Sequence, residues 1–297
     1  MAIRFAPKPQ ADPPGTSRVG SVRTFLDALV KFDRPGEAAY FYRGHASFTF
    51  AHVPSVYRNA GWISNEDVML KELTLRCPGD FPPSASTFQT LVKMQHYSLP
   101  TRLLDLTANP LIALYFATDP APIPGESGEV VAFKVPKREI KYYDSDTVGV
   151  IANIARRPGT FTVPAKNLTK AKFNQTEQIQ YLLHEIRQEK PYFEPAIVRT
   201  HLESVVCVKP KMDNPRIVRQ DGAFFLFGVS HSKSKPAQIP QRYIETHNSN
   251  RIIIDSTLKS KIRGQLEALG ISAGTVYPEI DKVAEFIRKS YERRSET

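Results

Sequence analysis

The chain has 297 residues, of which 41% are hydrophobic, and this is enough for one large folded domain or two small ones. It contains no run of about 18 apolar residues that could span a bilayer. The formal net charge of +10 predicts a positive surface that attracts polyanions, which makes nucleic acid the first partner to consider. A basic protein without a nucleic-acid partner fits the same charge equally well.

The first 20 residues are rich in proline and glycine and have no apolar segment of the kind found in secretion signals. We therefore expect residues 1–20 to form a flexible N-terminal arm. Cys77 and Cys207 lie far apart, and neither has a histidine or cysteine at the spacing of a metal site. We expect two buried thiols in a reducing cytoplasm, no bound metal and no membrane association.

Hydrophobic periodicity and turn residues predict both helices and strands along the chain. Expected strands cover residues 38–44, 102–106, 129–135, 204–208, 223–227 and 251–255. Expected helices begin at Ser21 and cover 64–76, 86–97, 110–118, 146–156, 175–188 and 256–269, with an amphipathic helix after Pro278. No internal repeat or glycine–serine linker divides residues 21–297. We predict one compact α+β domain with a mixed or antiparallel sheet and flanking helices.

The stretch MQHYSLPTRLLDLTANPLIALYFAT, residues 94–118, combines a short apolar strand with a strongly apolar helix. Asp105 lies in the middle of the strand, where a carboxylate buried on both sides is costly unless it is paired. Asn109 and Pro110 are typical of a helix cap and first turn, and the residues that follow predict a buried helix. Asp105 and Thr107 then lie at a rim with free helix N–H groups, which suits an anion.

Arg43 follows an aromatic strand, and Gly44 permits a close backbone approach just after it. An arginine in this position is either a structural ion-pair partner or a clamp for a phosphate or carboxylate. The same two alternatives, a structural role or a ligand contact, apply to Asp105 and Thr107 at the rim. Asp105 either meets a ligand or pairs with Arg102 or Arg43, and Thr107 either meets a ligand or only supports the helix cap.

Two further polar positions are candidates for a site. His96 is either a general base or substrate contact, or a core residue that caps the strand through backbone hydrogen bonds. Gln220 lies in the segment 215–222, which we interpret as a polar turn leading into the strand at 223–227.

Basic residues gather in three parts of the sequence. They are Lys134, Lys137, Arg138 and Lys141; Arg156, Arg157, Lys166, Lys170 and Lys172; and Lys209, Lys211, Arg216 and Arg219. Aromatic residues interleave the first two clusters, as in a channel that stacks single-stranded nucleic acid, but they fit ordinary loop anchors equally well. We expect the clusters at 134–172 and 209–219 to surround the mouth of the site as a track for a phosphate backbone.

Four segments together resemble the FRG domain, a family named for an aromatic-Arg-Gly motif. They are FYRGH at 41–45, the stretch at 94–118, RIVRQDGAFFLFG at 216–228 and LEALGISAGTVYPEID at 266–281. The resemblance spans about residues 38–288. Ser98, Leu106 and Tyr277 replace the family's usual Gly, Trp and Phe, and none of these changes alters a proposed polar role.

The order of these motifs is similar to that of the ADP-ribosyltransferase fold, and the resemblance implies NAD as a substrate. Arg43 with Gly44 would bind the NAD pyrophosphate or ribose through the fixed planar guanidinium. Thr107 with Asp105 would hold the nicotinamide-ribose side.

The resemblance also implies a third polar position, for which Gln220 is the candidate. Those enzymes more often use Glu there, so Glu279 and Asp281 are reserve candidates. The implied catalytic residues are therefore Gln220, Asp105 and His96.

Two hypotheses follow for the function. The first is an ADP-ribosyltransferase-like enzyme that cleaves NAD and modifies a nucleic acid or protein, as a bacterial toxin or phage-defence effector. The second is a non-catalytic nucleic-acid or nucleotide sensing module in which the same residues form a structural network. Either way, we expect Arg43, Asp105, Thr107 and Gln220 to converge on one cleft.

Overall fold

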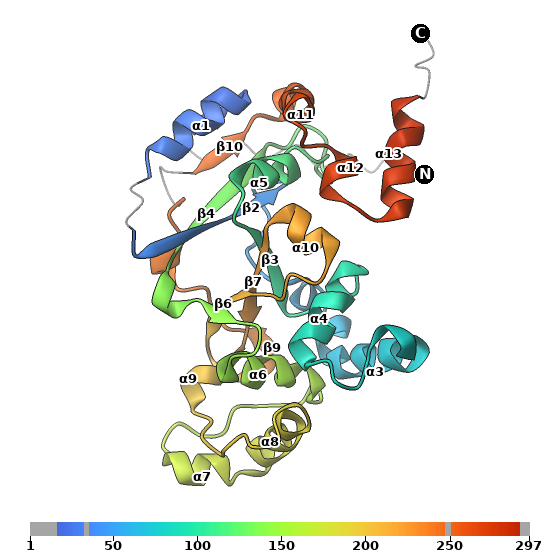
Figure 1. The fold of residues 1–297 in the computed structure, drawn as a ribbon. Helices are drawn as coiled ribbons and strands as arrows, with labels where there is room; N and C mark the ends of the chain where they lie inside the picture. Colours follow the sequence, from blue (N-terminus) through green and yellow to red (C-terminus); the bar gives the residue numbers. More distant parts are fainter. Residues whose placement is uncertain (1–16, 33–35, 247–250, 292–297) are drawn as a thin grey trace, which may run out of the picture.

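The computed structural model describes residues 17–32, 36–246 and 251–291, which form a mixed eight-stranded sheet packed against helices (Figure 1). Across the sheet the strands follow the order β1 (Ser17–Val19), β10 (Ile252–Ile254), β4 (Gly128–Pro136), β2 (Ala38–His45), β3 (Leu103–Thr107), β7 (Gly222–Phe227), β6 (Val205–Lys209) and β5 (Lys141–Tyr142). Neighbours from β10 to β6 are antiparallel, while β1 and β5 add parallel edges. The predicted α+β class and mixed sheet are confirmed.

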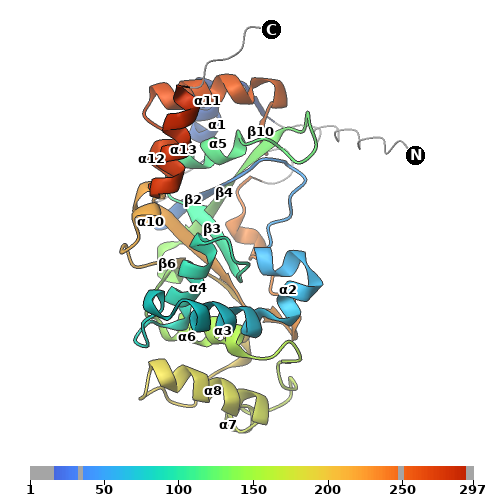
Figure 2. The same ribbon diagram turned by 90° about the vertical axis from the view of Figure 1, so that its right-hand side faces the viewer.

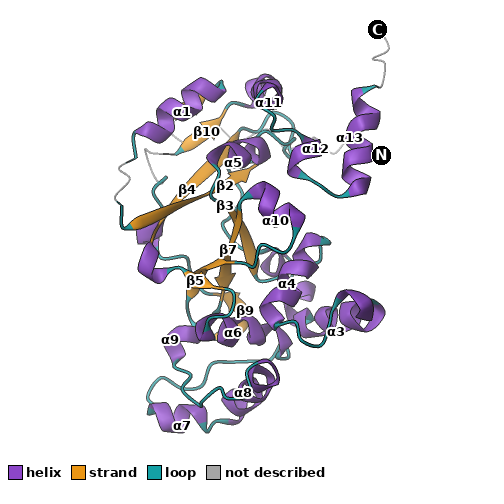
Figure 3. Cartoon of the chain, viewed as in Figure 1, coloured by secondary structure: helices purple, strands orange, loops and turns teal. Residues whose placement is uncertain are grey.

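Helices pack against this sheet, and a small second sheet pairs β8 (Val229–Ser230) with β9 (Ser232–Pro236) (Figure 3). The helices are α1 (Val22–Val30), α2 (Ala60–Ser64), α3 (Glu66–Arg76), α4 (Thr87–His96), α5 (Pro110–Ala117), α6 (Asp146–Ala152), α7 (Lys170–Asn174), α8 (Glu177–Glu189), α9 (Arg199–Leu202), α10 (Pro215–Gln220), α11 (Lys259–Ala268), α12 (Ala273–Val276) and α13 (Ile280–Ser290). No helix in the described ranges is long and apolar enough to cross a membrane.

Two groups of helices cover different halves of one sheet face (Figure 2). Helices α1, α5 and α11 pack on β10, β4 and β2, whereas α4 and α6 pack on the half that contains β3, β7 and β6, and α8 packs against α6. On the opposite face a third apolar cluster runs across both halves, with Phe41, Phe133 and Phe225 among its rings. The alternation of these side chains along each strand follows from the period of two in a pleated sheet.

A cluster of buried charges lies where β3 begins. Arg102 donates from Nε to Glu66 Oε1 at 2.9 Å, from Nη2 to Glu66 Oε2, and from Nη1 to the Phe227 carbonyl oxygen at 3.1 Å. Lys233 Nζ lies 3.2 Å from Glu66 Oε2, and all three charged side chains are fully buried. The two cations hold the pKa of Glu66 below its ordinary value against the effect of burial. Arg102 is thus committed to Glu66 and does not pair with Asp105.

Two expectations about element boundaries are wrong. Residues 215–220, interpreted as a polar turn, form α10, because Asn214 caps the helix by accepting from the Arg216 N–H and Pro215 occupies the first turn. Ser17–Val19, placed in the N-terminal arm, form β1 beside β10. The rest of the expected arm, residues 1–16, lies outside the described residues.

Candidate functional site

The central sheet opens between β2 and β3. In the described sheet these strands share one register pair, Tyr42 with Thr107, whereas Arg43 remains paired with Val131 of β4. Arg43 Nη1 donates to the Asp105 carbonyl oxygen at 2.8 Å. The arginine side chain therefore bridges the gap at which the main-chain hydrogen bonds between the strands stop.

Helix α5 closes one side of this opening and approaches β2 at Gly44. A Cβ on Gly44 would lie 1.9 Å from the Ala113 carbonyl oxygen, so a larger residue cannot fit without moving the helix or the strand. The expected close backbone approach is confirmed, and its partner is a helix. Gly44 also lines the adjoining cavity, where its cofactor role stays a prediction.

A cavity of about 270 Å³ occupies the opening. Its cationic lining residues come from three elements: Arg43 of β2, Arg58 of the 3-10 turn Ser55–Arg58, and Arg216 of α10. Phe50 and Phe116 supply aromatic surface. The carboxylates in the lining are those of Asp105 and Asp119, and Asp119 is engaged by Arg263 at 2.5 Å. The cavity thus favours an anionic ligand with an aromatic part.

The structure brings Arg43, Asp105, Thr107 and Gln220 together around this cavity, in line with the expected convergence. The guanidinium of Arg43 is held mainly by neutral acceptors. Besides the Asp105 carbonyl, its Nε donates to His45 Nε2 at 2.9 Å. The Asp105 carboxylate lies 3.7 Å from Nη1 and is 61% exposed, whereas the Arg43 side chain is 16% exposed. Burial lowers the pKa of Arg43, and the solvated carboxylate compensates this cation weakly.

His45 orients Arg43 without neutralising it. Burial lowers the pKa of His45 to about 2 and that of His52 to about 4, and the charge of Arg43 adds to both shifts. Both rings are therefore neutral at pH 7. Because Nε2 of His45 accepts from Arg43, its proton is on Nδ1, which is buried with no hydrogen-bond partner among the described residues.

Asp105 is exposed, which corrects the expectation of a buried carboxylate. Its side chain lies on the sheet face between the two helix groups, and neither group covers it. Its Oδ1 accepts from Gln95 Nε2 at 2.6 Å, and its cationic neighbour is Arg43. The result is a solvent-accessible carboxylate at the edge of a cationic cavity.

Thr107 and Gln220 use their polar groups within the protein. Thr107 Oγ1 donates to the Gln220 carbonyl oxygen at 2.5 Å and accepts from the Asn109 N–H at 3.0 Å, so it supports the cap of α5. Gln220 Nε2 donates to the Val276 carbonyl oxygen at 3.2 Å. Gln220 ends α10 and does not head β7, because Asp221, with φ of 46°, makes the turn between them. Roles of these side chains toward a ligand stay predictions.

His96 ends α4 and lines a second, smaller cavity of about 80 Å³. This cavity shares Asp105, Leu106, Arg216 and Gln220 with the larger one, so the two adjoin. Among the described residues, the His96 ring is paired with side chains and not with backbone groups. One is Glu279, whose Oε1 lies 3.2 Å from Nε2 and 3.8 Å from Arg216 Nη1. The other reserve acid, Asp281, is 71% exposed and lies 3.9 Å from Lys282.

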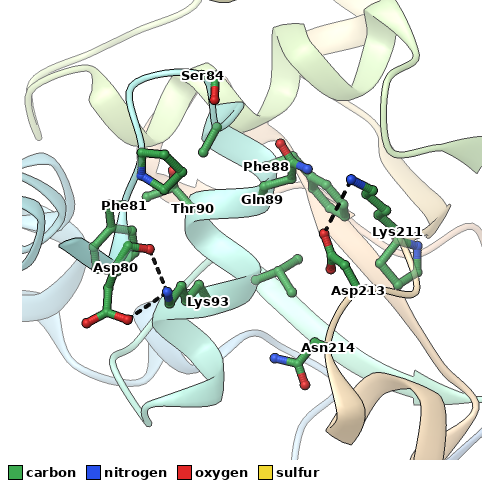
Figure 4. Close-up of a pocket in the computed structure, with 14 residues that line it drawn as sticks. Asp80, Phe81, Ser84, Phe88, Gln89, Thr90, Lys93, Lys211, Asp213 and Asn214 are labelled. Carbon is green, nitrogen blue, oxygen red and sulfur yellow. Dashed lines mark hydrogen bonds and ion pairs between the residues drawn. The ribbon is translucent and has the colours of Figure 1, made fainter. Parts of the chain in front are cut away.

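A larger cavity of about 490 Å³ lies between α4 and the segment 210–214 (Figure 4). Its charged groups are paired with one another: Lys93 Nζ is 2.8 Å from Asp80 Oδ1, and Lys211 Nζ is 3.9 Å from Asp213 Oδ2. No net charge remains to attract a ligand ion, so we assign the candidate site to the opening between β2 and β3.

The expected basic track around the mouth is wrong for its first two clusters. Lys134 is in register with Tyr40, and Pro136 with Ala38, so residues 134–138 lie toward the end of β2 away from Arg43. Helix α7, which carries Lys170 and Lys172, lies well away from α10 in both views (Figures 1 and 2). From the third cluster, Arg216 does line the site.

Sequence reasoning missed His45, Phe50, Arg58 and the site role of Arg216. His45 could have been found, because a residue two positions after Arg43 lies on the same face of a strand. The pair Asn214–Pro215 is the same helix-start signal as Asn109–Pro110 and predicts a helix that carries Arg216. Phe50 and Arg58 lie in irregular segments without such a signal.

Comparison with known proteins agrees with part of the resemblance. Residues 38–122 match the family model of the FRG domain. The match covers FYRGH and the stretch at 94–118, while the segments that carry Arg216 and Glu279 lie beyond it. Searches of curated proteins and of solved structures gave no match.

Proposed function

We propose that this chain, whose residues 38–122 match the FRG domain, is an ADP-ribosyltransferase-like enzyme that binds NAD at the opening between β2 and β3. The observation that carries the proposal is the state of Arg43, a largely buried guanidinium held by two neutral acceptors, with Arg58 and Arg216 in the same cavity. A pyrophosphate would add to the weak counter-charge that the exposed Asp105 carboxylate supplies from 3.7 Å, and planar guanidinium groups bind such oxygens bidentately.

Other residues of the cavity fit further parts of NAD. Phe50 and Phe116 offer apolar surface to an aromatic ring. The exposed carboxylate of Asp105 would stabilise the positive charge that develops at C1′ of the ribose as nicotinamide leaves. The cavity of about 270 Å³ is near the lower limit for ligand pockets, so part of the dinucleotide would extend along the edge at Asp105.

The test compares ligands that differ in the pyrophosphate. Calorimetric titration of the whole chain should show binding of NAD and of ADP-ribose, and weak or no binding of nicotinamide riboside, which lacks the pyrophosphate. Chromatography of the NAD reaction should show release of nicotinamide over hours. Equal affinity for NAD and nicotinamide riboside would contradict the assigned anion site.

A second candidate is a non-catalytic nucleotide sensor. It is favoured by Thr107 and Gln220, whose polar groups are satisfied inside the protein. The same experiment separates the two functions, because a sensor binds NAD or ADP-ribose through the arginines without releasing nicotinamide.

A further inference from the structure

His96, which lines the smaller cavity beside the opening, is paired with a glutamate. This residue is Glu279, in the segment between α12 and α13, and its Oε1 lies 3.2 Å from His96 Nε2. Both carboxylate oxygens of Glu279 are covered by protein, and neither accepts a well-formed hydrogen bond in the described part of the chain. The carboxylate therefore acts electrostatically on His96 and, at 3.8 Å, on Arg216.

Asn214 determines which nitrogen of His96 carries the proton. Its Oδ1 accepts from the Arg216 N–H at 2.8 Å as the cap of α10, which leaves its Nδ2 donor 3.4 Å from His96 Nδ1. Nδ1 must then be an acceptor, so the neutral ring has its proton on Nε2, facing Glu279. Because the Asn214 contact is long, a bound group can displace it and reach the Nδ1 lone pair.

We propose that the smaller cavity is the acceptor subsite of the ADP-ribosyl transfer, that the acceptor is a neutral hydroxyl group, and that His96 is the catalytic base for it. This inference rests on the proposed function. A space of about 80 Å³ accommodates a hydroxymethyl-sized group or water, given that a water molecule occupies about 30 Å³. A hydroxyl must lose its proton as it forms a bond, and the cavity offers a base for that proton.

The step balances without any other reactant. The bond between nicotinamide nitrogen and C1′ breaks, and its electron pair leaves with nicotinamide, which is then neutral. A lone pair of the hydroxyl oxygen forms the new bond to C1′, and the hydroxyl proton passes to His96 Nδ1. The imidazolium is stabilised by Glu279, which acts as a positioning residue. Asp105, which lines both cavities, lies where C1′ would pass between them.

The charges around His96 suit a base. Burial lowers its pKa, Glu279 opposes that shift, and Arg216 and Lys93 add to it, with a net direction downward. The ring is therefore neutral at pH 7 and able to accept a proton. Removing the Glu279 charge should lower this pKa further.

The experiment uses the whole chain with NAD, in water and with added methanol as a small hydroxyl acceptor. The readouts are NAD affinity by calorimetry, nicotinamide release, and the yields of ADP-ribose and methyl ADP-ribose. His96→Asn should lower both product rates about 100-fold or more, the usual contribution of a general base, and should leave NAD affinity within about twofold. His184→Asn, which changes an exposed histidine of α8, is the matched control and should change neither the product rates nor the NAD affinity.

The pH profile distinguishes a base from a structural histidine. The rate should rise with pH through a limb below the ordinary histidine pKa, and this limb should disappear in His96→Asn and move to lower pH in Glu279→Gln. Wild-type rates in His96→Asn, or a limb that survives in it, would overturn the acceptor subsite while leaving the NAD site intact. A wild-type chain that neither binds NAD nor releases nicotinamide would instead refute the proposed function, and the subsite with it.

Discussion

Arg43 donates to an imidazole and to a backbone carbonyl, and both acceptors are neutral. Its environment therefore fixes the direction of the guanidinium but leaves most of its charge for a ligand. Arg43→Lys keeps a positive charge but loses the fork of donors that spans His45 and Asp105. We expect NAD affinity to fall at least about 10-fold, equivalent to about 1.4 kcal/mol, when measured by calorimetry.

The same variant should unfold within a few degrees of the wild-type chain, because the neutral acceptors can bind water instead. Arg138→Lys, toward the other end of the β2–β4 pair, is the control and should leave NAD affinity unchanged. Loss of the thermal transition in Arg43→Lys would indicate that the arginine is a structural residue.

His52 makes stability depend on pH near the site. Burial lowers its pKa from the ordinary 6.5 to about 4, so the unfolded chain takes up a proton in this range and the folded chain does not. Stability should therefore fall as the pH falls from 6.5 to 4, by about 3 kcal/mol for a shift of this size. Denaturant titrations at pH 7 and 4.5 measure the loss, and His52→Gln should reduce it. An unchanged loss in that variant would assign the acid sensitivity elsewhere.

For single residues, the sequence identified Arg43 and Asp105 as site candidates by residue type and spacing. It could not predict how buried each side chain is or which groups it contacts. Asp105 was expected to be buried because its strand neighbours are apolar. Its exposure depends on a gap between helix groups that pack from distant parts of the chain, and local periodicity contains no information about that gap.

Among the secondary-structure elements, β2 and α5 approach each other closely because β2 has a glycine, Gly44, at the point of contact. Gly44→Ala would place a methyl group 1.9 Å from the Ala113 carbonyl oxygen, which forces the strand and helix apart. We expect a loss of about 2 kcal/mol or more in unfolding free energy and weaker NAD binding, since both elements line the cavity. Gly264→Ala is the matched control: a Cβ in this position of α11 meets nothing within 4 Å.

In a helix interior the control substitution should raise stability by up to about 1 kcal/mol. Thermal unfolding of the two variants, side by side, checks the prediction. Equal effects of both substitutions would show that the close contact with α5 does not explain the effect of Gly44→Ala.

Helix prediction succeeded where a start signal and an apolar face occurred together, as at Asn109–Pro110. It failed at Asn214–Pro215, because α10 has six residues and buries a single one of them, Ile217. A short, exposed helix has almost no hydrophobic periodicity, although its cap residues are the same. The missed helix is the one that brings Arg216 to the site.

The fold of the whole molecule depends on contacts between residues far apart in the chain. One example is the ion cluster of Glu66, Arg102 and Lys233, which joins three distant segments. Glu66→Gln would leave two buried cations without their counter-charge. We expect a loss of about 3–5 kcal/mol in unfolding free energy, measured by denaturant titration. Glu72→Gln breaks an exposed pair with Arg76 and should cost less than about 0.5 kcal/mol. Similar losses in both variants would contradict a structural role for the buried cluster.

The net charge of +10 is also a property of the whole molecule. The basic residues that contribute to it lie on different parts of the structure. Lys170 and Lys172 lie on α7, which is well away from α10 in both views, whereas Arg219 lies on α10, the helix that carries Arg216, and Lys211 precedes that helix in the chain (Figures 1 and 2). If single-stranded nucleic acid binds, the log–log salt slope should be about −0.7 per neutralised phosphate. The double variant of Lys170 and Lys172 to Glu should then flatten this slope by about 0.7 per lysine in contact, for every base sequence alike.

NAD affinity should not change in that variant, because α7 does not line the cavity. The matched variant of Lys211 and Arg219 to Glu tests the surface beside the site. If it alone weakens binding, the nucleic acid passes the opening between β2 and β3 and can present a ribose hydroxyl to the proposed site. If the α7 variant alone weakens binding, the nucleic acid binds at α7, away from the opening between β2 and β3. Fluorescence anisotropy over a salt series distinguishes these outcomes, and salt-independent or absent binding in all three proteins would remove nucleic acid as a partner and leave a protein or a small molecule as acceptor.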